Sequence, residues 1–254
     1  MKFFRAFSLA AILAAAPAFL VAQQGEPSGH APDTDSFERM MNITITAVTG
    51  APFSSIVTAE WTKMLEDGST ITRWNRRMVL RDAAGRIYQE RRILVPKGAQ
   101  IEPRLARIEI SDPAKHSKYF CQADARECVV RDYSGPAAED TEPTGSFGEG
   151  KMVLTREDLG KGNMSGVDVI GTKETRTIAA GVIGNDRPVT ITKEFWYSQQ
   201  LGLNMMVKRS DPRVGTQTFQ VTEVSLAGPD PKWFQAPPGY KVVDLRESAQ
   251  KGAR

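Results

Sequence analysis

Short stretches rich in β-branched and aromatic residues run through most of the chain, and turn residues separate them. Within these stretches hydrophobic and polar residues do not alternate cleanly. Asp67-Gly68 and the run 82–85 lie between β-branched and aromatic residues, which is typical of hairpins. Strand-like stretches recur at intervals of roughly 8 to 15 residues without amphipathic helices between them, so the pattern predicts a mainly β, antiparallel meander. We expect strands at 54–65, 70–81, 87–95, 104–110, 117–122, 127–133, 166–179, 188–198, 203–210 and 216–226.

Three segments depart from the strand pattern. Residues 34–42 could form a short helix with Asp35 or Ser36 as its cap. Residues 134–150 are acidic and rich in glycine and proline, and we expect a disordered loop there because they have little to bury. Residues 179–188 form a shorter insert between strands.

The stretch 70–81 carries three of its four arginines on one face, whereas Arg76 shares the other face with Trp74 and Met78. Arg73, Arg77 and Arg81 alternate with Trp74 and Met78, and Arg91 follows on the next expected strand. This pattern favours one buried face and one solvated face held by cross-strand charge pairs. A site for a polyanion is the alternative interpretation of the arginines.

The N-terminal 22 residues have the order of parts of a secretory signal peptide. Lys2 and Arg5 precede an apolar run, and Ala22 offers a small residue for cleavage, with an earlier cut after Ala18 as an alternative. A membrane anchor is the other interpretation, but Pro17 interrupts the run and no stop-transfer pattern follows. We therefore expect export to the periplasm or the extracellular medium.

The remaining chain divides into a flexible leader (23–36), a single β domain (37–245) and a polar tail (246–254). Loss of Lys2 and Arg5 with the signal lowers the formal net charge from +3 to +1. A nearly neutral chain has no bulk attraction to nucleic acid, and no later stretch is apolar for long enough to span a bilayer.

Export changes the expectation for the two cysteines, Cys121 and Cys128. Six residues lie between them, and strand-like residues flank both. Because an exported protein meets an oxidising environment, we expect a disulfide across the neck of a hairpin. A redox pair or a metal site are the alternatives, but the first favours a Cys-X-X-Cys spacing and the second needs more ligands than this region offers.

The C-terminal stretch 225–244 combines four prolines with a Trp-Phe pair. Asp230 followed by Pro231 is typical of a helix start, so a single helical turn should place Trp233 and Phe234 as a hydrophobic plug on the open end of the sheet. Pro237-Pro238-Gly239 should end the turn and release a last extended piece. A cofactor-binding box is the less favoured interpretation.

The same ending carries a family resemblance. The runs 211–215, 230–234 and 237–240 resemble a motif of uncharacterised exported bacterial proteins whose architecture is similar to that of periplasmic outer-membrane lipoprotein-sorting proteins. This resemblance, which covers roughly 165–243, implies a single curved antiparallel sheet, a half-barrel of about 9–11 strands with few short helices. It also implies a concave face that can hold an acyl chain.

The sequence contains no pattern of catalytic residues, so we expect no enzyme and no cofactor. The histidines are His30, in the leader, and His116, in a turn, which are too few for a histidine metal cluster. A hydrolase using His116 would need a nucleophile motif that is absent. The acidic pairs Glu139-Asp140 and Glu157-Asp158 are expected in loops, without the pattern of a sugar cleft.

Two functional hypotheses follow. The first is a binding module whose concave face takes a lipid or a lipoprotein acyl chain, with each lining candidate alternatively an ordinary core residue. The second is an interaction or sensor protein that engages a partner in the cell envelope through a sheet edge or through Arg73, Arg77 and Arg91, without a small ligand. The lining candidates of the first hypothesis are Trp61, Trp74, Met78, Phe195, Met205 and Phe219.

Overall fold

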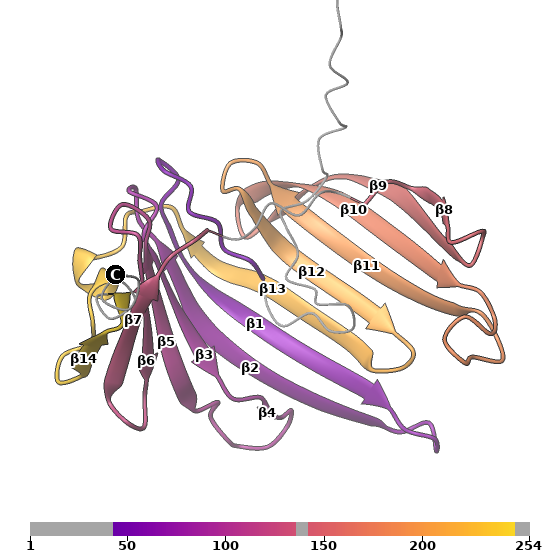
Figure 1. The fold of residues 1–254 in the computed structure, drawn as a ribbon, viewed down its shortest axis with the longest axis horizontal. Coiled ribbons are helices and arrows are strands. Elements are labelled where there is room, and N and C mark those ends of the chain that lie inside the picture. The colour runs from indigo at the N-terminus through magenta and orange to yellow at the C-terminus, as the bar shows by residue number, and fades with distance from the viewer. Residues whose placement is uncertain (1–42, 136–141, 247–254) are drawn as a thin grey trace, which may run out of the picture.

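A computed structural model describes residues 43–135 and 142–246, which form one strongly curved sheet that does not close into a barrel (Figure 1). The signal peptide, the leader, the expected helix at 34–42 and most of the polar tail lie outside the described residues. The sheet has 14 strands, more than the 9–11 expected. They are β1 (Phe53–Met64), β2 (Thr70–Arg81), β3 (Ile87–Arg92), β4 (Val95–Pro96), β5 (Leu105–Asp112), β6 (Ser117–Gln122), β7 (Glu127–Asp132), β8 (Gly145–Phe147), β9 (Met152–Met164), β10 (Val167–Ile178), β11 (Val189–Ser198), β12 (Leu203–Asp211), β13 (Gly215–Ser225) and β14 (Lys241–Asp244).

The strand order shows two meanders joined in the middle of the sheet. Along the sheet the order is β14-β7-β6-β5-β3-β2-β1-β13-β12-β11-β10-β9-β8, and β4 pairs separately with β2. The pairing of β1 with β13 joins the two halves of the chain. The predicted curved β-sheet is therefore confirmed. One detail differs: β14 pairs with β7 in parallel, so the sheet is mixed rather than wholly antiparallel.

Strand β9 was not expected from the sequence. It pairs with β10 along its whole length, and the pair Glu157-Asp158, expected in a loop, lies within it. A bulge at Gly160 interrupts the register, and the Asp158 carboxylate accepts a hydrogen bond from the Gly160 backbone N–H at 2.7 Å. Short β8, at residues 145–147 of the acidic stretch, covers only the first part of β9.

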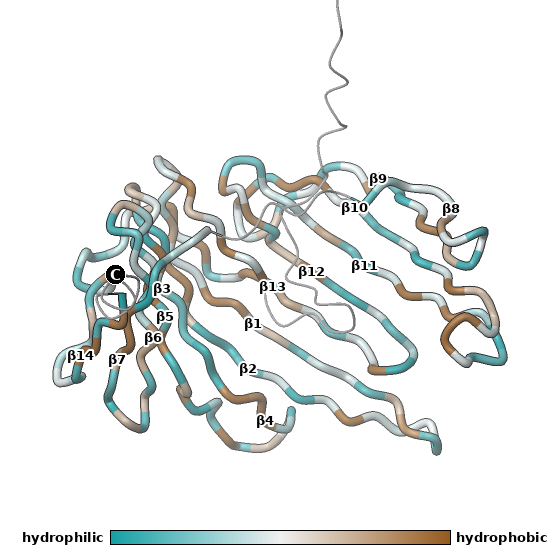
Figure 2. The backbone as a smooth tube through the Cα atoms, in the orientation of Figure 1, coloured by the Kyte–Doolittle hydropathy of each residue, from teal (hydrophilic) through white to brown (hydrophobic). Residues whose placement is uncertain are grey.

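The two faces of the curved sheet differ in what they bury. We call the face that carries Val57, Val79 and Glu109 the inner face, and the face that carries Leu80 and Tyr88 the outer face. The tube of Figure 2 shows hydrophilic and hydrophobic residues mixed along the central strands, without strict alternation. The larger hydrophobic cluster joins the central strands to Ile43 and Ile45 of the N-terminal described segment; its buried members are Ile43, Ile45, Phe53, Val57, Ala59, Val79, Ile87, Val167, Val169, Phe195, Leu201, Leu203, Met205, Val207, Phe219 and Val221.

Arg81 fastens the N-terminal segment to the sheet. Its side chain is fully buried over the Phe53 ring, and its guanidinium donates hydrogen bonds to the carbonyl oxygens of Ala51, Thr46 and Leu201 at 2.9, 2.9 and 2.6 Å. Because these acceptors come from the N-terminal segment and from the β11–β12 turn, one side chain holds three parts of the chain together. Burial lowers the pKa of Arg81 to about 10.

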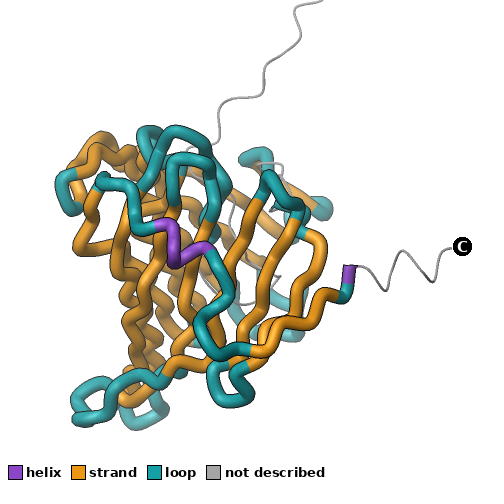
Figure 3. Tube along the Cα trace, turned by 90° about the vertical axis from the view of Figure 1, so that its left-hand side faces the viewer, coloured by secondary structure: helices purple, strands orange, loops and turns teal. Residues whose placement is uncertain are grey.

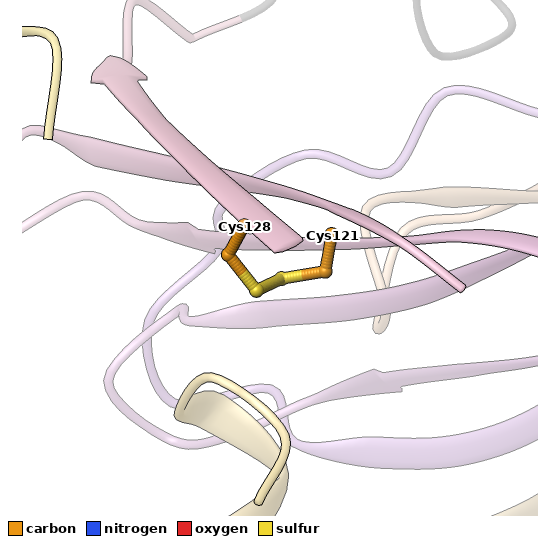
Figure 4. Close-up of a disulfide and its surroundings, with 2 residues drawn as sticks. All are labelled: Cys121 and Cys128. Carbon is orange, nitrogen blue, oxygen red and sulfur yellow. A yellow bond between two sulfur atoms is a disulfide. The ribbon is translucent and has the colours of Figure 1, made fainter. Parts of the chain in front are cut away.

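On the outer face, the predicted disulfide and the predicted plug lie close together. Cys121 and Cys128 face each other across β6 and β7 with a Cα–Cα distance of 3.9 Å, and their bond confirms the hairpin staple (Figure 4). Beside them, the 3₁₀ turn η1 (Pro231–Phe234) crosses the outer side of the sheet (Figure 3).

The plug forms as expected but in a different place. The Asp230 side chain caps η1 by accepting the Lys232 backbone N–H at 2.9 Å. Phe234 packs in the second hydrophobic cluster, and the Trp233 ring meets Tyr88 edge to face with centroids 5.2 Å apart. The plug does not lie at an open end of the sheet as expected, because η1 packs on the outer face of β3 and β5.

We predict that Phe234→Ala lowers the free energy of unfolding by about 3–5 kcal/mol, because it leaves a cavity in a cluster where Phe234 is only 5% exposed. Urea denaturation of the purified chain measures the change. Val242→Ala, at a half-exposed position of β14, is the control and should change stability by less than about 0.5 kcal/mol. Equal effects of the two variants would contradict the placement of the plug.

Candidate functional site: a cation patch on the inner face

Four cations gather on the inner face at the end of the sheet formed by β3, β5, β6 and β7. The register places Arg91, Arg107, Lys118 and Arg131 on this face around one carboxylate, Glu109. We call these five residues the cation patch. Its strands belong to one antiparallel meander, so the side chains come from positions close in sequence.

Glu109 is the acceptor that the patch shares. Its carboxylate is almost completely buried, with 2% of the side chain exposed. Arg91 binds it in a bidentate manner through Nε and Nη2, both at 3.0 Å. Arg107 Nη2 donates at 2.5 Å and Lys118 Nζ lies at 3.2 Å. One carboxylate therefore serves three cations from three strands.

The electrostatics of the patch are visible in the pKa values of two buried groups. Burial alone would raise the pKa of Glu109, but the hydrogen bonds and charge of Arg91, with the charges of Lys118 and Arg107, hold that pKa at about 2. Arg77 lies behind the patch on β2, and burial together with the charge of Arg91 lowers its pKa to about 9. The inner face here is thus an environment that favours negative charge and resists further positive charge.

Like charges stand directly opposite each other at two places in the patch. Arg91 pairs in register with Arg107, and Lys118 pairs in register with Arg131. Like charges at directly opposed positions of a sheet are destabilising. Glu109 compensates part of this repulsion, and with four cations to one carboxylate the patch keeps an excess of positive charge.

The side chains of the patch are partly exposed to solvent, so a ligand can contact them. The side chains of Arg91, Arg107 and Lys118 are 28%, 38% and 25% exposed, and Arg131 is exposed. Phe120 lies between them, with the Arg107 guanidinium 5.5 Å and the Lys118 ammonium 4.8 Å from its ring centroid. Stacking on Phe120 limits the directions in which these two cations can point.

The arginines singled out in the sequence all lie on the inner face, but their exposure to solvent differs from the expectation. Arg73 is exposed, whereas Arg77 and Arg81 are buried, with only 4% and 0% of each residue exposed. The expected solvated face was therefore wrong for β2. The sheet curves around this side, and the N-terminal segment packs across it, so that Arg81 is enclosed rather than hydrated.

The six candidates for an apolar lining do not form one surface. Phe195, Met205 and Phe219 are buried members of the larger hydrophobic cluster. Trp61 is on the inner face, where its indole N–H donates to the Val214 carbonyl oxygen at 2.8 Å. The last two lie on the outer face, since Trp74 and Met78 pair in register with Glu60 and Ile56.

Four residues of the patch were not singled out in the sequence: Glu109, Arg107, Lys118 and Arg131. The Cys121–Cys128 pair could have indicated two of these residues. Once Cys121 faces Cys128 across a hairpin, the register also puts Lys118 opposite Arg131.

A separate open depression of about 500 Å³ lies near the β9–β12 end of the sheet. Its lining mixes Lys161 with Asp168 and adds Tyr197, Gln199 and Gln200. Since cation and carboxylate are balanced there, the depression selects for no particular ligand charge.

Within residues 43–135 and 142–246, no three histidine, cysteine or acidic side chains come together as a metal site. The same part of the chain has no helix that is both long and apolar enough to cross a membrane. His116 is exposed in the β5–β6 turn, as expected.

No family model and no curated protein matches the sequence. Solved structures with a similar fold include a chain of the MucA/MucB complex of Pseudomonas aeruginosa, with 13% identity over 76% of this chain and 58% of that chain, at a TM-score of 0.37. An uncharacterised conserved protein from Thermus thermophilus has 9% identity over 77% of this chain and 91% of its own, at a TM-score of 0.34. This chain therefore spans less than two thirds of the first of these structures.

A third similar structure is a putative outer-membrane lipoprotein-sorting protein domain from Vibrio parahaemolyticus, with 11% identity over 72% of this chain and 89% of that chain, at a TM-score of 0.27. At this level of similarity these structures specify no family, ligand or partner for this chain.

We predict that Glu109→Gln lowers the free energy of unfolding by about 2–3 kcal/mol near neutral pH, because Arg91, Arg107 and Lys118 lose their shared buried carboxylate while their partial exposure to solvent reduces the cost. The pKa of Glu109 is depressed by folding, so its stabilisation is complete above the ordinary pKa of 4.5 and is lost as the pH falls towards about 2. The difference between wild type and variant in urea denaturation should therefore shrink across that range.

Glu223→Gln provides the control, because Glu223 pairs with Arg76 where both side chains are about half exposed or more. It should change stability by no more than about 1 kcal/mol at any pH. A Glu109→Gln difference that stayed constant from pH 4.5 to pH 2 would contradict the depressed pKa.

Proposed function

We propose that this is an exported binding protein whose cation patch recognises an acidic, extended segment of a partner protein in the cell envelope. The observation that carries the proposal is the concentration of four accessible cations around one buried carboxylate, with two like-charged pairs in direct register. Export is supported by the N-terminal sequence pattern.

An extended acidic segment fits the shape of the patch. The patch crosses four adjacent strands, a width of roughly 14 Å at the usual strand spacing. A single small anion would be served by one or two of these side chains. Carboxylates spaced along an extended chain can instead meet arginine and lysine from several strands. Arg131 is exposed and offers a planar donor group suited to a carboxylate.

An acyl chain is less well supported as the ligand of this face. Three of the candidate lining residues, Phe195, Met205 and Phe219, already pack against other side chains of the hydrophobic core. Two others, Trp74 and Met78, lie on the opposite face. A lipid would therefore need to open a packed cluster, whereas an acidic segment would meet side chains that are already accessible.

The test is binding of a fluorescein-labelled peptide of alternating glutamate and serine to residues 23–254, measured by fluorescence anisotropy. We expect binding that weakens strongly as salt is added, because the contacts are exposed charges. Arg131→Glu, an exposed position without a role in the core, should weaken binding about tenfold or more, which corresponds to about 1.4 kcal/mol.

Arg76→Glu makes the same charge change on the outer face, where Arg76 is 49% exposed, and should leave the affinity unchanged. Vesicles containing phosphatidylglycerol are the second probe. Binding to vesicles but not to the peptide, or an equal loss of peptide binding in both variants, would contradict the proposal.

A further inference from the structure

The cation patch has a complementary segment within the same chain. Residues 23–42, directly before the described part of the structure, carry four carboxylates and one arginine, a formal net charge of −3. The charged residues are Glu26, Asp33, Asp35, Glu38 and Arg39. This is the charge that the patch would select in a partner.

The point of attachment brings this segment to the right face. Residue 43 is the first that the structure describes, and Ile43 is buried in the larger hydrophobic cluster together with Ile45. Three residues further on, the Thr46 carbonyl oxygen accepts a hydrogen bond from Arg81, an inner-face side chain of β2. The chain therefore enters the sheet on the inner face, the same face as the patch.

The length of the segment is sufficient. Thr46 is held by Arg81 of β2, three strand spacings or about 14 Å from β6. Ile43 is at most about 10 Å along the chain from Thr46, so about 24 Å is the most that separates it from β6 across the strands. The eight peptide links from Asp35 to Ile43 can span up to about 27 Å. Asp33 and Asp35 can therefore reach Lys118 on β6 without any movement of the sheet, and the linkage makes their local concentration high.

We infer that residues 23–42 bind the cation patch within the same molecule and compete with the external partner. This inference rests on the proposed function, because it assigns a regulator to the same surface. An acidic partner segment must then displace the chain's own carboxylates. The apparent affinity for the partner is reduced by the fraction of molecules in which the patch is already covered.

The contact itself can be tested without any ligand. Carbodiimide treatment of residues 23–254 joins carboxylates to lysine amines that touch them, and mass spectrometry of tryptic fragments identifies the pairs. We expect the fragment that ends at Arg39 to be linked to Lys118. Links from this fragment only to outer-face lysines such as Lys173 and Lys208, or no link from it at all, would overturn the inference.

Competition is tested in the same chain by Asp33→Asn, Asp35→Asn and Glu38→Gln together. If about 10% of wild-type molecules have an open patch, this variant should bind the glutamate–serine peptide about tenfold more tightly. Glu66→Gln, Glu149→Gln and Glu157→Gln remove the same charge from exposed positions elsewhere and should leave the affinity at the wild-type value.

The two proposals can fail separately. Equal peptide binding by wild type and by the leader variant would overturn the competition and leave the proposed function in place. A Lys118 cross-link in a protein that binds no peptide in either form would instead overturn the proposed function and retain the intramolecular contact.

Discussion

Glu109 is the group on which the arrangement of the inner face depends. Four cations on neighbouring strands repel one another, and two of the pairs are directly opposed in register. A buried carboxylate that accepts from Arg91, Arg107 and Lys118 at once makes this arrangement compatible with a folded sheet. Its low pKa shows that the cations favour the charged form more strongly than burial disfavours it.

The two faces of the sheet carry different kinds of contact. The outer face of β3, β5, β6 and β7 is closed by apolar packing, a disulfide and the capped turn η1. This fixes the four strands from behind. Because the backbone that carries the patch is also held by contacts on the other side, the order of these strands does not depend on the ion pairs of Glu109 alone.

Much of the fold could be predicted from the sequence because local sequence patterns indicate it. Four signals depend on residues close in the chain: the hairpin turns, the β-branched and aromatic runs of β1 and β2, the Cys121–Cys128 staple and the Asp230-Pro231 start of η1. Strand β9 was missed because its charged, glycine-containing sequence has low strand propensity. Its pairing with β10 and a bulge at Gly160 stabilise it all the same.

The site was less predictable, because it depends on register and on curvature. Alternation places Arg77 and Arg81 on one face correctly, but it does not say which way the sheet bends. The face with more charge was taken as the solvated one, whereas the sheet curves around it and the N-terminal segment crosses it. Likewise, Glu109 becomes the centre of the patch only when β3, β5 and β6 are aligned.

The central claim is that acidic partners meet the inner face at the cation patch, and arginine side-chain NMR tests it most directly. The Nε–Hε signals of the arginines in residues 23–254 would be followed during titration with the glutamate–serine peptide. The account predicts shifts at Arg91, Arg107 and Arg131 and none at Arg76 on the outer face. Shifts at Arg76 with unchanged patch signals would contradict it.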